Sequence, residues 1–126
     1  MADCRVDAST MKRSIFIAPI PRFDVESARD YGEICFLFPD VKSVNPFGGQ
    51  DCLRRIAEAM EKIGFDSKED SIGLSGPVPS VAMMVLAALE LSVDGTISVL
   101  IFDARDGGTY RSRALSPDEL VPNNDT

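Results

Sequence analysis

The amino-acid sequence predicts an α/β domain, a small Rossmann-like fold in which helices flank a mostly parallel sheet that ends in an antiparallel hairpin strand. Short apolar segments alternate with stretches of helical periodicity along the chain. These segments are continuously hydrophobic, as are the strands of a sheet that is covered on both faces. Near the C-terminal end, Asp106-Gly107-Gly108 separates the last two strand-like segments, a sequence typical of a hairpin turn.

The chain length predicts one domain. With 126 residues the chain can build one hydrophobic core of ordinary size. We expect a flexible leader over residues 1–12, a single α/β domain over residues 13–115 and a flexible acidic tail over residues 116–126. Met11 is an alternative to Met1 as the first residue.

Proline and glycine mark the first strand and the first helix. Residues 14–18 are mostly β-branched or aromatic and are followed by Pro19, so we expect a strand there. Residues 24–33 place apolar side chains at helical spacing between Asp24, a capping residue, and Gly32, a terminating residue. This pattern predicts a short helix.

A second strand, a loop and a surface helix follow. Residues 34–38 predict a buried strand that ends before Pro39, and Asn-Pro and Gly-Gly pairs mark residues 41–50 as a loop. The next helix ends at Gly64 and is amphipathic, because its apolar residues recur at helical spacing. Those residues are Leu53, Ile56, Ala57, Met60 and Ile63.

The second half of the domain alternates in the same way. Residues 70–76 predict a third strand, and residues 77–91 predict a helix with proline in its first turn, where the missing N–H costs least. Residues 95–104 have the strongest strand pattern of the chain. After the hairpin turn, residues 109–115 predict the last strand.

The helix at residues 77–91 has almost no polar face. A helix that is apolar all round must be covered on both sides, and a chain of this size has few elements left to cover the second side. We therefore expect a homo-oligomer built on this helix. A central helix inside a monomer is the alternative.

Charge argues against direct nucleic-acid binding. The formal net charge is -7, whereas proteins that bind nucleic acid neutralise phosphates with a basic surface. An acidic surface could instead imitate DNA toward a basic protein partner. The chain has no histidine, which excludes a histidine general base, a Ser-His triad and a histidine-bearing zinc site.

The cysteines and the apolar runs indicate in which cellular compartment the protein acts. The longest apolar run, residues 81–89, is shorter than the roughly 20 residues that span a bilayer, so we expect no membrane insertion. The three cysteines show no C-x-x-C spacing, and Cys35 lies in an apolar run where a thiol packs as a small hydrophobic group. These features favour a reduced cytoplasm.

Candidate ligand-binding residues follow the predicted strands, because ligands of open α/β sheets bind beyond the carboxyl ends of the strands. Backbone N–H groups at the start of the helix after Gly76 and the hydroxyls of Ser75 and Ser80 could hold a phosphate or carboxylate. A plain strand-to-helix corner is the alternative. The candidates are Arg22, Phe23, Asp40, Ser75, Gly76, Ser80, Asp103 and Arg105. We assign no catalytic residue, metal ligand or cofactor.

Two further pairs are open to more than one interpretation. Asp40 and Asp103 could hold Mg²⁺ if their strands are neighbours, although aspartates at strand ends also form turns with their own backbone. Arg111 and Arg113 share a face of the last strand. They could contact an anionic ligand or partner, or form a solvated edge that resists aggregation.

Several motifs occur in order along residues 14–115: YGEICFLF, NPF, DSIGLSG, an apolar helix, DGTISVLIFDA and YRSRAL. In these motifs the chain resembles a family of small, largely uncharacterised proteins of tailed bacteriophages and prophages. In this chain Tyr31 replaces the usual aromatic partner of Gly32-Glu33, and Pro-Ile-Pro after the first strand departs from the family pattern. The resemblance implies a viral accessory role in the host cytoplasm and supplies no catalytic residue.

Three functional hypotheses follow. The first is a non-enzymatic accessory protein for counter-defence or host takeover, an oligomer that sequesters a nucleotide-like anionic ligand or inhibits a host protein. The second is a small nucleotide-processing enzyme of phosphodiesterase-like activity that acts through Ser75, Asp40 or Asp103. The third is an acidic inhibitor that mimics nucleic acid, which predicts carboxylates clustered on one face.

Overall fold

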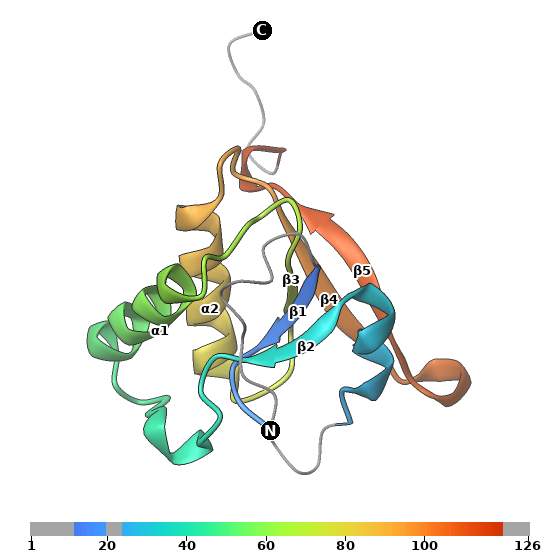
Figure 1. Cartoon of the computed structure of the whole chain (residues 1–126), viewed down its shortest axis with the longest axis horizontal. Helices are drawn as coiled ribbons and strands as arrows, with labels where there is room; N and C mark the ends of the chain where they lie inside the picture. Colours follow the sequence, from blue (N-terminus) through green and yellow to red (C-terminus); the bar gives the residue numbers. More distant parts are fainter. Residues whose placement is uncertain (1–11, 20–23, 120–126) are drawn as a thin grey trace, which may run out of the picture.

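The computed structural model describes residues 12–19 and 24–119 and contains a five-stranded sheet with helices on both faces (Figure 1). The predicted α/β class is confirmed. The elements in chain order are β1 (Arg13–Phe16), η1 (Glu26–Tyr31), β2 (Glu33–Phe36), η2 (Val41–Ser43), α1 (Gln50–Lys62), β3 (Ser71–Gly73), α2 (Val78–Leu91), β4 (Ile97–Asp103), η3 (Arg105–Gly107), β5 (Thr109–Leu115) and η4 (Pro117–Glu119).

The strand order is β2-β1-β3-β4-β5. The first four strands are parallel, and β5 pairs antiparallel with β4 from Thr109 opposite Asp103 to Leu115 opposite Ile97. From β1 the chain moves outward to β2, and from β2 it returns across β1 to β3. Because β-crossover-β connections are right-handed, this reversal of direction brings η1 and the pair α1 and α2 to opposite faces of the sheet.

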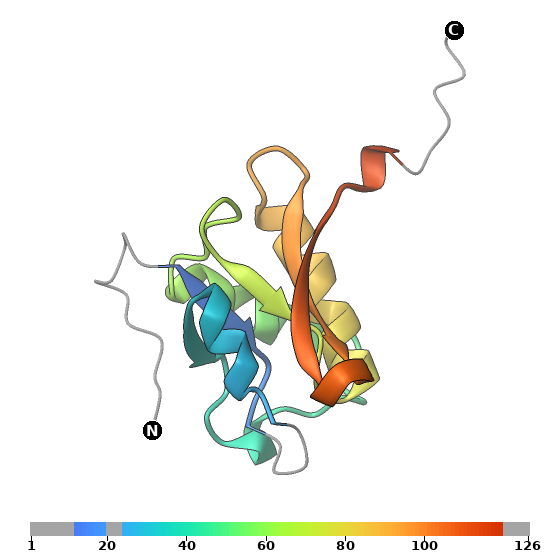
Figure 2. The same ribbon diagram turned by 90° about the vertical axis from the view of Figure 1, so that its right-hand side faces the viewer.

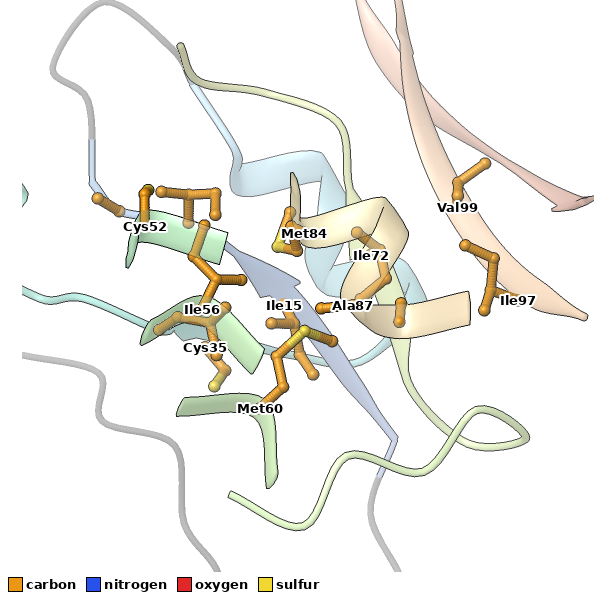
Figure 3. Close-up of a cluster of buried hydrophobic side chains, with 14 residues drawn as sticks. Ile15, Cys35, Cys52, Ile56, Met60, Ile72, Met84, Ala87, Ile97 and Val99 are labelled. Carbon is orange, nitrogen blue, oxygen red and sulfur yellow. The ribbon is translucent and has the colours of Figure 1, made fainter. Parts of the chain in front are cut away.

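The larger core lies between the sheet and the helices α1 and α2. Ile56 and Met60 of α1 and Met84 of α2 pack with Ile15 and Ile72 of the sheet (Figure 3). All five side chains are fully buried. The predicted amphipathic stripe of α1 is thus confirmed, and burial of these side chains supplies the main hydrophobic stabilisation of this face.

A smaller core lies between the opposite face of the sheet and η1. The ring of Phe16 meets Tyr110 edge-on, with 5.6 Å between centroids, and this geometry is favourable for aromatic pairs. Gly73 of β3 makes room for the same ring, because a Cβ at that position would lie 2.0 Å from Cε1 of Phe16. The glycine in the third strand is therefore a packing requirement of the aromatic cluster.

A buried ion pair ties the first strand to the loops on the helical side of the sheet. Arg13 donates from Nε and Nη2 to the two carboxylate oxygens of Asp70, at 3.1 and 2.8 Å, and both side chains are at most 7% exposed. The guanidinium also donates to the carbonyl oxygens of Ile63 and Gly64. Asp70 in turn accepts the backbone N–H of Asp66 at 2.8 Å. Every charged group of this cluster is hydrogen-bonded, as burial requires.

Several predicted elements differ in kind or extent. The helix expected at 24–33 is the 3-10 helix η1, six residues long, because its first turn is closed by the short bond from the Ala28 N–H to the Val25 carbonyl. The strand expected at 70–76 is only Ser71–Gly73. Within the expected loop at 41–50 lies η2, and the expected hairpin turn contains η3.

The predicted free thiol at Cys35 is wrong. Cys35 is buried in β2 and is disulfide-bonded, whereas Cys52 of α1 is a free, buried thiol. Sequence position alone does not distinguish a packed thiol from a paired one. Cys35 therefore gives no support for a reducing compartment. Residues 1–11 of the expected leader and 120–126 of the expected tail lie outside the described residues.

The Arg13–Asp70 pair predicts a large stability difference between two matched substitutions. Asp70→Asn leaves the buried guanidinium of Arg13 without its counter-charge, so we expect the free energy of unfolding to fall by about 3–5 kcal/mol in urea denaturation. Glu26→Gln breaks the exposed Arg29–Glu26 pair instead and should cost less than about 1 kcal/mol. Equal losses in both variants would contradict a structural role for the buried pair.

Candidate functional site

The carboxyl ends of the four parallel strands lie along one edge of the sheet. The chain leaves β1 in one direction and β3 in the other, and ligands of open α/β sheets bind where this reversal occurs. Ser75 and Gly76 follow β3 at this position. Arg22 and Phe23, the candidates that follow β1, lie outside the described residues.

Asp40 lies apart from the other candidates. It follows β2, and two strands, β1 and β3, separate β2 from β4, which ends at Asp103. The Asp40 carboxylate accepts the backbone N–H of Lys42 at 3.0 Å, and its carbonyl accepts the Ser43 hydroxyl at 2.7 Å. Asp40 is therefore a turn-forming residue, and the neighbouring strands required for an Asp40–Asp103 magnesium site are not present. Within the described residues no group of three metal-ligating side chains occurs.

Ser75 is joined to the smaller core. Its hydroxyl lies 2.6 Å from the Tyr110 hydroxyl, and Tyr110 is the buried aromatic residue of β5. Burial raises the pKa of Tyr110, and the charge of Asp24 acts in the same direction, while the bond to Ser75 opposes both. The Ser80 hydroxyl in the first turn of α2 is fully buried and has no hydrogen-bond partner in the structure.

Asp103 and Arg105 form the strongest polar cluster at this edge, together with Arg111. Arg105 donates to both Asp103 carboxylate oxygens, from Nε and Nη2, at 2.9 Å each. Arg111 donates from Nε to Oδ2 of Asp103 at 2.7 Å. The Asp103 side chain is only 10% exposed, whereas the two guanidinium groups face solvent. One carboxylate thus positions two cations.

The hairpin pairing explains why these residues meet. Asp103 lies opposite Thr109, and Ile101 lies opposite Arg111. Side chains two residues apart on a strand share a face, and so do directly opposed ones, so Arg111 lies diagonally across from Asp103 on the same face. Arg113 is on that face too, two residues farther along β5. Their spacing predicted that Arg111 and Arg113 share a face. It did not predict them as site residues, because their partners on β4 depend on the register of the hairpin.

The cluster borders a cleft of about 300 Å³. Its lining residues are Ile101, Phe102, Asp103, Ala104, Arg105, Arg111 and Arg113. Three guanidinium groups against one carboxylate leave an excess of positive charge in a chain whose formal net charge is -7. Ile101 and Phe102 add exposed apolar surface to the same cleft. The cleft therefore offers cationic donors beside an apolar wall.

Bonds to both arginines hold the pKa of Asp103 far below its ordinary value. The bond from Arg105 is the largest cause, followed by the bond from Arg111, and burial acts weakly in the opposite direction. The same pairing raises the pKa of Arg105. At neutral pH the carboxylate is ionised and both guanidinium groups are charged, so the cluster is a fixed arrangement of charges and not a proton-transfer device.

A larger hollow of about 610 Å³ lies at the opposite edge, where the strands begin. Lys12 and Arg29 line it, but Asp30 and Glu33 do so as well and offset their charge. The hollow is also more open to solvent than the cleft. Neither its charge balance nor its shape selects a ligand class, so the cleft beside Asp103 is the stronger candidate.

Comparison of the chain with protein families, with curated proteins and with solved structures finds no match. None of the helices in residues 12–19 and 24–119 is long and apolar enough to cross a membrane.

The arginine cluster predicts an unusual titration of Asp103. The pKa of Asp103 is lower in the folded protein than in the unfolded chain, so the ionised carboxylate stabilises the fold. That stabilisation is fully present above the ordinary aspartate pKa of about 3.9 and is lost as the pH falls through the lower folded-state pKa. We expect the NMR chemical shift of the Asp103 carboxyl carbon to show that the carboxyl group is still ionised at roughly pH 3. The double variant Arg105→Gln/Arg111→Gln should move the pKa back toward about 3.9.

The control for this titration is Arg54→Gln, which removes an exposed guanidinium of α1 paired with Asp51. It should leave the Asp103 titration unchanged. Protonation of wild-type Asp103 near the ordinary aspartate value would show that the two arginines do not hold its carboxylate.

Proposed function

We propose that the protein binds a small, nucleotide-like anionic ligand in the cleft beside Asp103 and sequesters it without chemical change. The observation that carries this proposal is the single carboxylate that holds Arg105 and Arg111 at 2.7–2.9 Å beside a third arginine, Arg113. Guanidinium groups fixed in advance lose less conformational entropy on binding than free ones.

The unused donors fit a phosphate group. Arg111 uses only its Nε in the bond to Asp103, which leaves the donors on both Nη atoms for another acceptor. Arg105 keeps Nη1 in the same way. Guanidinium groups bind phosphate oxygens in pairs of parallel, charge-assisted hydrogen bonds. Beside these donors, Ile101 and Phe102 provide the apolar contact that a flat base or similar ring would use.

Several observations favour binding over catalysis. An aspartate that is ionised and covered by two guanidinium groups is a poor general acid or base at neutral pH. Ser75 lies on the other face of the sheet, bonded to Tyr110, and no base within the described residues is paired with it. The same cations would compete with a metal ion for Asp103. The phosphodiesterase-like enzyme therefore remains the weaker alternative.

A host-protein target is a second candidate, favoured by one residue. Phe47 is 90% exposed on a turn in which the Asn45 side chain accepts the Phe47 N–H and the Asn45 carbonyl accepts the Gly48 N–H. Aromatic side chains presented in this way act as anchors of protein interfaces.

In either case we propose, on the basis of the sequence resemblance, that the protein acts in the cytoplasm of an infected cell as a phage-type accessory factor. Mimicry of nucleic acid has no comparable local feature to support it.

Ligand binding is tested by native mass spectrometry and calorimetry of the full chain with mononucleotides and cyclic nucleotides. We expect a nucleotide to be retained with unchanged mass. Arg111→Gln should weaken its binding by about tenfold or more, since one charge-assisted hydrogen bond is worth roughly 1.5–3 kcal/mol. Arg54→Gln, the matched exposed arginine on α1, should bind like the wild type.

Three other outcomes would contradict the proposal. Equal affinity of the Arg111→Gln and wild-type proteins would place the ligand elsewhere. A nucleotide product of altered mass would favour the enzyme. If no nucleotide binds at all while Phe47→Ser abolishes the effect of the protein on its host, the protein-inhibition alternative takes precedence.

A further inference from the structure

One face of α2 carries apolar side chains that the monomer leaves uncovered. Val78 is 79% exposed and Leu86 is 57% exposed, and Ala82 between them is exposed as well. Residues four apart lie on one stripe of a helix, so these three and Glu90 form a continuous line along α2. We call residues 78, 82, 86 and 90 the α2 stripe.

The opposite face of α2 is covered by the protein itself. Met84, Ala87 and Ala88 are buried in the larger core, and Figure 1 and Figure 2 show α1 and α2 side by side on one face of the sheet. The sequence alternative of a central helix inside the monomer does not account for the exposed stripe.

We propose that the α2 stripe binds the same stripe of a second copy of this chain, with the two helices antiparallel about a two-fold axis. The midpoint of the stripe falls between Ala82 and Leu86. Around that axis Ala82 of one protomer opposes Leu86 of the other, and Val78 opposes Glu90. The small side chain thus meets the large one in both halves of the contact, as close helix packing requires.

Charge complementarity favours a second copy over another occupant. Glu90 is the only charged residue of α2, it is exposed, and no ion-pair partner for it occurs among the described residues. The opposite end of α2 begins after Pro77 with no side-chain cap and no acidic residue in its first turn. Pro77 and Pro79 have no N–H, and the Val81 N–H is bonded to the Pro77 carbonyl. The Val78 N–H and the positive end of the helix dipole are therefore what attract a carboxylate here. The antiparallel arrangement brings each Glu90 to the start of the other helix.

This inference is independent of the proposed ligand site, because the α2 stripe contains neither Asp103 nor any of the three cleft arginines.

The test is sedimentation velocity of the full chain at tens of micromolar. We expect the wild type to sediment at twice the chain mass of 13.7 kDa. Ala82→Glu alone and Leu86→Arg alone should each sediment as monomers, since each places an unpaired charge against an apolar side chain.

An equimolar mixture of Ala82→Glu and Leu86→Arg should recover the dimer, because the axis brings Glu at position 82 to Arg at position 86 and leaves the other contact native. A mixture of Ala82→Glu with Leu86→Glu should stay monomeric. Phe47→Ser, which removes an exposed aromatic residue far from α2 in sequence, should leave the dimer intact. Both substituted positions are exposed in the monomer, so the thermal unfolding of each single variant should be that of a folded protein.

Three results would overturn the proposal. The wild type could sediment as a monomer at every concentration, either single variant could remain dimeric, or the complementary mixture could fail to dimerise although both variants are folded. The milder variant Leu86→Ser adds no charge and removes both copies of Leu86 from the dimer. It should raise the dissociation constant by about a hundredfold, roughly tenfold for each leucine side chain lost.

Discussion

The buried pair of Arg13 and Asp70 is the interaction on which the arrangement of the domain depends. Arg13 opens the central strand β1, and its guanidinium also holds the carbonyls that end α1. Asp70 directly precedes β3, the neighbour of β1. The guanidinium of Arg13 thus links three elements: the central strand β1, the end of α1 and the start of β3. The helices α1 and α2 pack on one face of the sheet.

The charged side chains of the candidate site lie on the hairpin of β4 and β5, at the edge of the sheet. At the reversal point the Ser75 hydroxyl is already bonded to Tyr110, and the Ser80 hydroxyl is enclosed. The antiparallel hairpin extends beyond this point and holds Asp103, Arg105 and Arg111 near solvent. The hairpin therefore converts the edge of a hydrophobic sheet into a charged cleft.

The sequence predicted those features that follow from local patterns. Apolar runs predicted β1 to β4, helical periodicity predicted α1, and an apolar segment with proline in its first turn predicted α2. Asp-Gly-Gly predicted the hairpin and with it β5. The strand order, which separates Asp40 from Asp103, could not be predicted because it depends on packing between distant segments. Arg13 stands at the edge of the expected leader, 57 residues from its partner, so no local pattern connected the two. The role of Arg111 likewise depends on the hairpin register.

The most direct test of the anion cleft is to follow the arginine Nε–Hε signals by NMR while inorganic pyrophosphate is added to the full chain. The account predicts saturable shifts that are largest for Arg105, Arg111 and Arg113, with Arg54 unchanged. Shifts confined to Arg29 would place anion binding at the opposite edge of the sheet, and the absence of saturable shifts at the three cleft arginines would contradict the account.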